Sequence, residues 1–348
     1  MSELARVVDE LAEFIALDSV TGREAAYAEA AAAALTASGF ATELIPAAPG
    51  RPNVVARRGR GRVLFCTHLD TVPPFIPPRR ESDRVHGRGA CDAKGAFACM
   101  LAAARRLVAE GAEDLAFLLV VGEEVDHHGA KAARELGLTA EAVVLGEPTE
   151  GRLMVAQKGI LRLVLRTRGR AAHSGYPETG ESAIGKLLDV LAGIRALDLG
   201  ADPLLGPALL NVGRIAGGVA ANVLAPAAEA ELLFRTVAPP EALLARLAEV
   251  VGDRAELELG ARTDPIHLHA LAGFPSAIAG FATDAPYLTG IGPVLLAGPG
   301  SIRVAHTAHE HVTHAELAAG VELYSELARR VLAGEALLPA GAGPAGRH

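Results

Sequence analysis

The stretch Leu115-Ala-Phe-Leu-Leu-Val-Val-Gly-Glu-Glu124 predicts a buried β-strand that ends in two adjacent carboxylates. Similar short apolar runs occur at 63–67 and 142–145, and helical patterns separate the runs at 96–110 and 130–136. Strands that are apolar throughout and joined by helical crossovers are typical of a largely parallel sheet with helices on both faces. The sequence therefore predicts an α/β fold with a mostly parallel sheet.

Polar side chains follow each of these strands closely. His68, the pair Glu123 and Glu124, and Glu147 all lie within three residues of the end of a predicted strand. In open parallel sheets, ligands bind beyond the carboxyl ends of the strands. We therefore expect these side chains to form one site.

The composition predicts a large folded core and excludes two classes of partner. The chain has 348 residues, of which 50% are hydrophobic, and its length favours two domains over one. Its net charge of −8 and its pI near 5.9 argue against nucleic acids and anionic membranes as partners. The arginines of segment 57–62 are separated by glycines, so we interpret this segment as a solvated turn.

The cysteines and the absence of a leader pattern predict a cytoplasmic protein. Cys66, Cys91 and Cys99 are an odd number without zinc-knuckle spacing, and no cationic leader precedes an apolar segment. The alanine-rich stretch 25–37 is interrupted by Glu29 and is shorter than the ~18 apolar residues of a membrane span. This stretch therefore predicts a packed helix.

The pattern changes at about residue 158 and changes back near 262. Between these points, four strands and two helices follow the order β-α-β-β-α-β, which is the ferredoxin-like arrangement. The strands lie near 161–166, 209–215, 229–237 and 255–259, and the helices at 182–197 and 240–250. We therefore predict a first domain formed by 1–157 and 263–335, with 158–262 inserted as an α+β domain. Segment 336–348 lacks the apolar residues to pack and is predicted to be disordered.

The carboxylates and histidines at the strand ends predict a divalent-metal site. A ligand set rich in oxygen, with imidazoles but no thiolates, suits zinc, cobalt or manganese, and two such ions about 3.5–4 Å apart are common in amide hydrolysis. His68 and Asp70 are two residues apart and face the same way, so Asp70 is expected to hydrogen-bond one imidazole nitrogen while the other binds metal. Of Glu123 and Glu124, one would bind metal and the other would act as general base.

Each of these residues also has an ordinary structural interpretation. Asp92 precedes a helix and could cap its N-terminus instead of bridging two metals. Glu123 and Glu124 could belong to a solvated acidic turn that continues into 126–128. Glu147 could be a surface residue at the end of its strand.

Five motifs occur in an order that resembles the signatures of one family. They are His68-Leu-Asp-Thr-Val-Pro73, Gly87-Arg-Gly-Ala-Cys-Asp-Ala-Lys-Gly95, Gly122-Glu-Glu124, Gly146-Glu-Pro148 and Ala305-His-Thr-Ala-His-Glu310. The family comprises the di-zinc metallohydrolases of the aminoacylase, carboxypeptidase G, acetylornithine deacetylase and succinyl-diaminopimelate desuccinylase group. The motifs span nearly the whole chain.

The resemblance implies a role for each residue of the predicted site. His68 and Glu147 would bind one zinc or cobalt ion, Glu124 and His306 would bind the other, and Asp92 would bridge them. Glu123 would be the general base. Asp70 would support the catalytic centre beside His68. The resemblance also implies a cis peptide bond between Asp92 and Ala93.

The inserted domain resembles the lid of that family, which also forms the dimer. His173 matches a lid histidine that stabilises the oxyanion in the partner's active site, and Asn222 and Arg235 match positions that hold substrate. A guanidinium binds carboxylates bidentately, so Arg235 suggests an α-carboxylate in the substrate. Asp284 is expected either to contact a substrate amine or to cap a helix. Without the resemblance, His173 would be a loop histidine and Arg235 a solvent-facing strand residue.

Two positions depart from the family pattern. Leu233 stands two residues before Arg235, where many relatives have aspartate, and this could loosen the orientation of the guanidinium. His309 stands where aspartate, asparagine or glycine is commoner, and it adds an imidazole three residues from His306. Neither departure removes a predicted metal ligand.

These observations predict a cytoplasmic homodimeric hydrolase that removes the acyl group from an N-acyl amino acid, most like an acetylornithine deacetylase of arginine biosynthesis. The preference for this subgroup rests on the strings at 211–218, 221–226 and 298–300. Within the family, a succinyl-diaminopimelate desuccinylase, a carrier-protein-linked lysine or ornithine hydrolase and a dipeptidase are the alternatives. From a different class, a non-catalytic binding protein that keeps the fold is the alternative.

Overall fold

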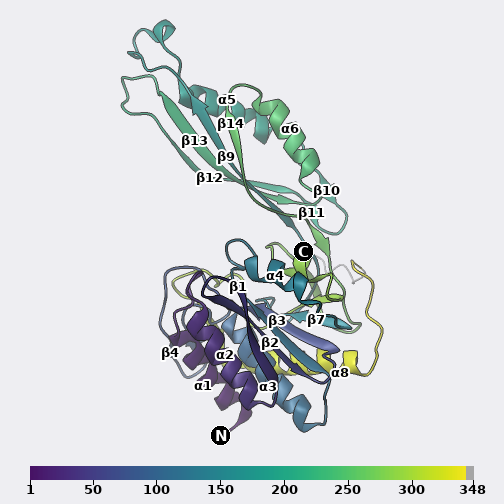
Figure 1. The fold of residues 1–348 in the computed structure, drawn as a ribbon. Coiled ribbons are helices and arrows are strands. Elements are labelled where there is room, and N and C mark those ends of the chain that lie inside the picture. The colour runs from purple at the N-terminus through teal and green to yellow at the C-terminus, as the bar shows by residue number, and fades with distance from the viewer. Residues whose placement is uncertain (342–348) are drawn as a thin grey trace. The chain divides into compact units, whose positions relative to one another are not determined.

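A computed structural model of the chain describes residues 1–341, which divide into two compact units (Figure 1). The larger unit contains 1–155, 267–277 and the chain from Thr283 onward, and the smaller unit contains 156–266 and 278–282. The segments of the larger unit are therefore separated in sequence by inserted segments of the smaller unit. The predicted α/β class, with an inserted α+β domain, is confirmed.

The larger unit is built on a mixed sheet whose centre is parallel. Within residues 1–341 this sheet has nine strands in the order β1-β2-β6-β3-β7-β17-β8-β15, and β16 pairs with β8. The strands are β1 (Ala41–Ala48), β2 (Arg51–Arg58), β3 (Val63–His68), β6 (Leu115–Val120), β7 (Ala142–Leu145), β8 (Leu153–Gln157), β15 (Ile266–His267), β16 (Ser276–Ala279) and β17 (Val294–Leu296). β3 pairs in parallel with both β6 and β7, and β17 pairs in parallel with β7.

The central strands form as predicted because they are apolar on both faces. Every residue of β3, β6 and β7 is buried, which requires cover on both sides of the sheet. The helices of this unit are α1 (Glu3–Ala16), α2 (Ala25–Ala37), α3 (Lys94–Ala109), α4 (His128–Ala133), α7 (Ala285–Leu288) and α8 (His314–Leu332), and a 3₁₀ turn (Arg134–Leu136) follows α4. None of the helices within residues 1–341 has the length and apolar character to cross a bilayer.

A small second sheet and one end segment complete the larger unit. The sheet has the order β18-β5-β4, formed by β18 (His311–Thr313), β5 (Arg84–His86) and β4 (Arg79–Arg80). The ordered chain extends past the predicted end at 335, because Leu338 pairs with Ala270 and its backbone N–H donates to the Ala270 carbonyl at 2.8 Å. The rest of the predicted disordered segment, 342–348, lies outside the described residues.

The smaller unit has the predicted β-α-β-β-α-β order. Among residues 156–266, its main sheet has four antiparallel strands in the order β12-β13-β9-β14. The elements are β9 (Gly159–Arg168), α5 (Ala183–Arg195), β12 (Leu209–Gly217), β13 (Ala227–Thr236), α6 (Glu241–Val251) and β14 (Glu256–Thr263), with a 3₁₀ turn (Pro177–Thr179) and the short pair β10 (Ala201–Asp202) and β11 (Gly206–Pro207). β9 alternates buried and exposed residues, so one face packs on the helices and the other is polar.

Candidate metal centre

The predicted ligands converge because three parallel strands end at the same edge of the sheet. His68 is the last residue of β3, and its Nε2 lies 3.0 Å from Oδ1 of Asp92. The side chains of His68 and Asp92 are both buried. Asp92 comes from the loop before α3, which the Asp92–Ala93 cis peptide bond joins to the helix, as the resemblance implies.

Asp92 lies between two histidines. His306 Nε2 is 3.1 Å from the second Asp92 oxygen, Oδ2, and 3.1 Å from Glu124 Oε1. Each oxygen of Asp92 therefore faces a different imidazole, which is the arrangement that a carboxylate bridging two cations requires. The N-cap interpretation of Asp92 is wrong, because Ala93 is the N-cap of α3 and has no side-chain capping bond.

Glu147 is buried beyond the end of β7, so it is not a surface residue. Its Oε1 has no hydrogen-bond partner among the residues that the structure describes. A buried carboxylate oxygen is unfavourable without a donor or a cation beside it. His68, Asp92 and Glu124 offer ligand atoms that all lie within 4.8 Å of one another. This donor set of oxygen and imidazole nitrogen fits a divalent metal.

Burial and the neighbouring charged groups shift the pKa values of the residues at this site. Burial alone would raise the pKa of Asp92, but hydrogen bonds from His306 and His68 outweigh it and hold that pKa below its usual range. The carboxylates of Asp92 and Glu124 raise the pKa of His306 to about 10. At Glu147 burial dominates and raises the pKa well above its usual range. The field at this edge of the sheet therefore favours a cation.

Asp70 contacts one imidazole nitrogen of His68, as predicted, and has a second task. The Nδ1 atom of His68 lies 2.9 Å from the backbone carbonyl of Asp70 and 3.5 Å from its carboxylate, so the carbonyl is the closer acceptor. The carboxylate of Asp70 also accepts from Thr21 Oγ1 at 2.8 Å and from the backbone N–H groups of Glu123 and Glu124 at 3.0 and 3.2 Å. Asp70 thus orients His68 through its backbone and holds the glutamate pair through its side chain.

The glutamate pair is not a solvated turn. The side chains of Glu123 and Glu124 are 10% and 7% exposed. Burial, followed by the charge of Glu147, raises the pKa of Glu123 well above its usual range. A second group of possible ligand atoms joins Glu123 to His127 and Asp284. His127 was not predicted to be functional, because Asp126-His127-His128 has the composition of an exposed turn.

The remaining predicted residues belong to the smaller unit, and the structure brings two of them together. His173 and Val223 form an isolated bridge, and the Ser174 N–H donates to the Asn222 carbonyl at 3.0 Å. His173 and Asn222 are exposed in these neighbouring loops. Arg235 is half-buried on β13, and its Nη1 is buried without a hydrogen-bond partner in the described chain. Burial also lowers the pKa of Arg235.

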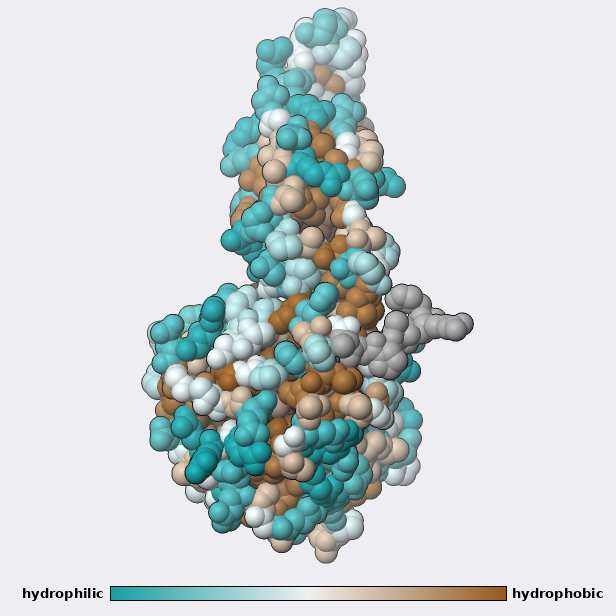
Figure 2. Space-filling model, turned by 90° about the vertical axis from the view of Figure 1, so that its right-hand side faces the viewer, coloured by the Kyte–Doolittle hydropathy of each residue, from teal (hydrophilic) through white to brown (hydrophobic). Residues whose placement is uncertain are grey.

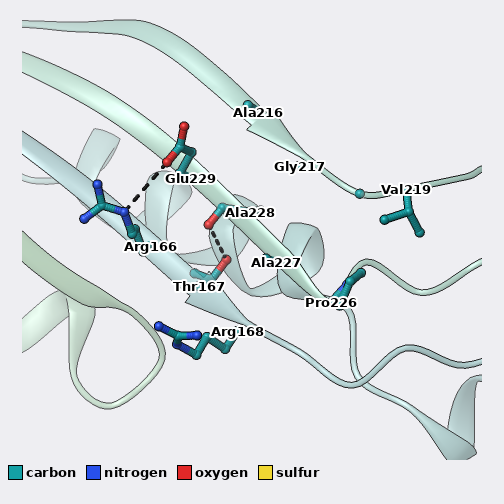
Figure 3. Close-up of a pocket in the computed structure, with 11 residues that line it drawn as sticks. Arg166, Thr167, Arg168, Ala216, Gly217, Val219, Pro226, Ala227, Ala228 and Glu229 are labelled. Atoms are coloured by element: carbon teal, nitrogen blue, oxygen red, sulfur yellow. Dashed lines mark hydrogen bonds and ion pairs between the residues drawn. The ribbon is translucent and has the colours of Figure 1, made fainter.

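A separate cavity lies at one end of the smaller unit's sheet (Figure 3). It has a volume of about 350 Å³ and lies where β9, β12 and β13 meet the loops. Arg166 faces Glu229 there at 3.7 Å, and Thr167 donates to the Ala228 carbonyl at 3.3 Å. The lining does not include His173, Asn222 or Arg235. The face drawn in Figure 2 mixes hydrophilic and hydrophobic residues on both units.

Comparison with known proteins identifies the family of the site. The model of peptidase family M20/M25/M40 matches residues 64–330. A peptidase M20 domain-containing protein of Schizosaccharomyces pombe is 38% identical over 327 residues, which cover 90% of this chain and 82% of that protein. A probable carboxypeptidase of Aspergillus clavatus is 34% identical over 367 residues, covering 92% and 81%.

The fold comparison agrees with the sequence comparison. The crystal structure of aminopeptidase PepT from Bacillus cereus superposes with a TM-score of 0.79 and 24% identity, covering 94% of this chain and 99% of that chain. The similarity to this structure concerns the fold. The predicted family resemblance and the prediction of a metal-dependent hydrolase of amide bonds are confirmed at the level of the family.

Proposed function

The chain belongs to peptidase family M20/M25/M40, and from this membership we propose that it hydrolyses short linear amides whose leaving amine is an amino acid with a free α-carboxylate. Dipeptides, carboxypeptidase substrates and N-acyl amino acids all share that carboxylate. The observation that carries the proposal is the Asp92 carboxylate, which has one imidazole at each oxygen and the buried Glu124 beside it.

The residues present fit two divalent ions. We assign His68 and Glu147 to one ion, Glu124 and His306 to the other, and Asp92 to both, with zinc as the first candidate and cobalt as the second. Bound ions of this kind polarise the scissile carbonyl and lower the pKa of an attacking water. The unpartnered Oε1 of Glu147 supports its inclusion as a ligand.

Glu123 is the proposed general base. Its buried carboxylate has a raised pKa, which suits a group that accepts a proton from water and later returns it. The oxygen of that water adds to the carbonyl carbon, the carbon–nitrogen bond breaks, and the proton from Glu123 goes to the leaving amine. The products are a carboxylate and a free amino acid.

Arg235 is the proposed contact for the substrate carboxylate. Its buried, unpartnered Nη1 is a donor in need of an acceptor, and a guanidinium matches a carboxylate in geometry. His173 and Asn222 lie in adjacent loops and would bind the oxyanion and the substrate, respectively. The names of the curated relatives, which include probable carboxypeptidases, support a substrate with a free carboxyl end.

A substrate panel tests this proposal. Chelator-treated protein would be assayed with and without zinc or cobalt on N-acetyl-L-ornithine, N-succinyl-L,L-diaminopimelate, dipeptides and the same dipeptides with C-terminal amides. We expect metal-dependent release of free amino acid from the carboxylates, and at least a tenfold lower kcat/KM for the amides, because they cannot pair with Arg235. Equal rates for acids and amides would overturn the carboxylate requirement.

Two variants separate the general base from nearby residues that carry no assigned role. Glu123→Gln is expected to lower kcat by about 100-fold or more while both metals remain bound, because the base is lost and its volume is kept. His309→Ala changes an exposed imidazole near the site and should leave kcat within about twofold, since no reacting group depends on it. Full activity of Glu123→Gln would require another base.

Within the panel, N-acetyl-L-ornithine tests the acetylornithine deacetylase assignment and a role in arginine biosynthesis. Turnover of this compound above the dipeptides would support it, together with a cytoplasmic location. Preference for dipeptides would instead assign the enzyme to peptide breakdown. In both outcomes the protein is still a hydrolase.

We further propose a homodimer through the smaller unit, with His173 acting in the partner's site. In the main sheet of residues 156–266, β12 is an edge strand, and its Leu209 and Ile215 are 52% and 54% exposed. Inactive His173→Ala and Glu123→Gln subunits are refolded or co-expressed together. A random mixture should regain up to about a quarter of wild-type activity, since about half of the dimers are heterodimers and one of the two sites in each is intact. If mixed heterodimers stayed inactive, each site would be completed within one chain.

A further inference from the structure

We propose that His127 is a positioning residue that orients the carboxylate of Glu123, and that Asp284 holds His127 in place for this task. The inference rests on the proposed function, in which Glu123 is the general base. It assigns to Asp284 a role other than contact with substrate. All three residues belong to the larger unit.

One ring nitrogen connects the two carboxylates. His127 Nδ1 lies 2.9 Å from Asp284 Oδ1 and 3.8 Å from Glu123 Oε1. The first distance is that of a hydrogen bond, whereas the second is too long for one and would become a hydrogen bond only after a small shift of the Glu123 carboxylate. Both carboxylates therefore approach the same ring nitrogen, and the nearer of the two is Asp284.

The burial of Asp284 indicates that its carboxylate interacts with other residues of the protein and not with solvent. Its side chain is 1% exposed, whereas those of His127 and Glu123 are 14% and 10% exposed. Asp284 is the N-cap residue of α7, but no side-chain capping bond accompanies it in the described structure. Asp284 therefore begins α7, as one of the two predictions had it, but its carboxylate does not cap the helix. Its recorded hydrogen bond goes to His127, so the buried carboxylate serves that imidazole.

The backbone at His127 is held in an uncommon conformation. Its φ of 56° lies in the left-handed region, where residues other than glycine are uncommon and asparagine, aspartate and histidine are the most frequent of them. The His127 N–H donates to the Gly122 carbonyl at 2.7 Å, and the ring packs on Tyr287 with centroids 5.1 Å apart. The hydrogen bond thus holds the His127 backbone, and the contact with Tyr287 holds its imidazole ring.

The backbone of the glutamate pair is already fixed by Asp70, whereas the Glu123 side chain has three torsions beyond the backbone. An N–H donor on one side of the carboxylate reduces the number of rotamers that it can occupy. A general base must be aligned with the proton that it accepts, and a misplacement of about 1 Å can lower a rate by about 100-fold. We therefore expect His127 to affect kcat more than KM.

Two substitutions of His127 distinguish the effect of its N–H donor from the effect of its backbone conformation. Asparagine and glycine both accept a φ of 56°, but only asparagine places an N–H donor near the position of Nδ1. We expect His127→Gly to lower kcat by about 10- to 100-fold with KM within about threefold, and His127→Asn to recover most of that loss. Asp284→Asn should lie between them, because the acceptor that aligns the ring is weakened.

The control and the metal content make the test specific. His128→Ala alters the adjacent histidine, whose Nε2 bonds to the Ala47 carbonyl at 2.7 Å, and should retain wild-type kcat. The metal content of His127→Gly, measured by elemental analysis, should equal that of the wild type. Equal kcat for the Gly and Asn variants, or loss of metal in His127→Gly, would overturn the positioning role. A raised KM with unchanged kcat would instead indicate substrate contact and would also overturn it.

A readout without turnover distinguishes failure of this inference from failure of the proposed function. Nitrogen-15 NMR of the histidine rings should show a proton on Nδ1 of His127 that Asp284→Asn shifts. If Glu123→Gln loses activity but the His127 variants behave alike, only the inference fails. If Glu123→Gln stays fully active, the proposed function fails, whatever the NMR result.

Discussion

At the scale of single residues, carboxylates of the same chemical type have different environments and hence different roles. Burial alone would raise the pKa of Asp70, but its contact with His68 and the hydrogen bonds from Thr21 and from the Glu123 backbone N–H outweigh burial and lower that pKa. Glu123 and Glu147 are buried with few donors, and their pKa values are raised. The first environment suits an anchor, the second a base or a metal ligand.

Asp70→Asn tests this anchoring role. An amide has one acceptor oxygen where the carboxylate has two, so at least one of the N–H groups of Glu123 and Glu124 would lose its acceptor. We expect a loss of about 1–3 kcal/mol in unfolding free energy, together with a lowered kcat. Urea denaturation and steady-state kinetics would measure the two effects. Unchanged stability would mean that the glutamate loop holds its shape without Asp70.

At the scale of secondary-structure elements, the loop before α3 is held by a residue more than 200 positions away. The carboxylate of Glu310 pairs with Arg88 at 2.5 Å and accepts from the backbone N–H groups of Gly89, Cys91 and Asp92 at 2.9, 3.3 and 3.3 Å. Both partners of the ion pair are buried. This anchoring places Asp92 at the ends of the parallel strands, where the histidines reach it.

The edge strand β12 is the element on which the dimer proposal depends. Ile215→Lys would put a charge on a strand edge that is expected to meet its counterpart. We expect the variant to be monomeric in size-exclusion chromatography with light scattering, and kcat to fall with the dimer because His173 would no longer reach a partner. Lys substitution at the exposed Leu44 of β1 is the matched control. A monomeric wild-type protein with full activity would contradict the proposal.

At the scale of the whole molecule, bound metals should contribute measurably to stability. Removing them leaves the buried carboxylates Asp92, Glu123, Glu124 and Glu147 facing one another. An ion at 100 times its dissociation constant adds about 2.7 kcal/mol, and because each kcal/mol raises the Tm of a domain of this size by about 2–4 °C, the expected rise is about 5–11 °C. We expect chelation to lower the Tm and zinc to restore it in calorimetry. A Tm that did not respond to chelator would argue against a metal site in the folded protein.

Much of the fold was predictable from local patterns. The apolar runs before His68, Glu123 and Glu147 were predicted to be strands, and they are. A run that is apolar throughout is typical of a strand buried on both faces, and every residue of these three strands is buried. The order of elements in the inserted unit was also predictable, because alternation in strands and helical spacing are properties of neighbouring residues. The position of Leu338 was not predictable, because this residue is held by its pairing with Ala270, which is distant in sequence.

The sequence by itself determined which residues stand at the ends of the parallel strands, because strand period and polarity are encoded locally. Only the tertiary structure decided how their side chains are shared. It placed one Asp92 oxygen at each histidine, turned the Asp70 carboxylate to the glutamate backbone, and brought Asp284 to His127 across 157 residues. Such contacts depend on chain packing in three dimensions, and no spacing along the sequence specifies them.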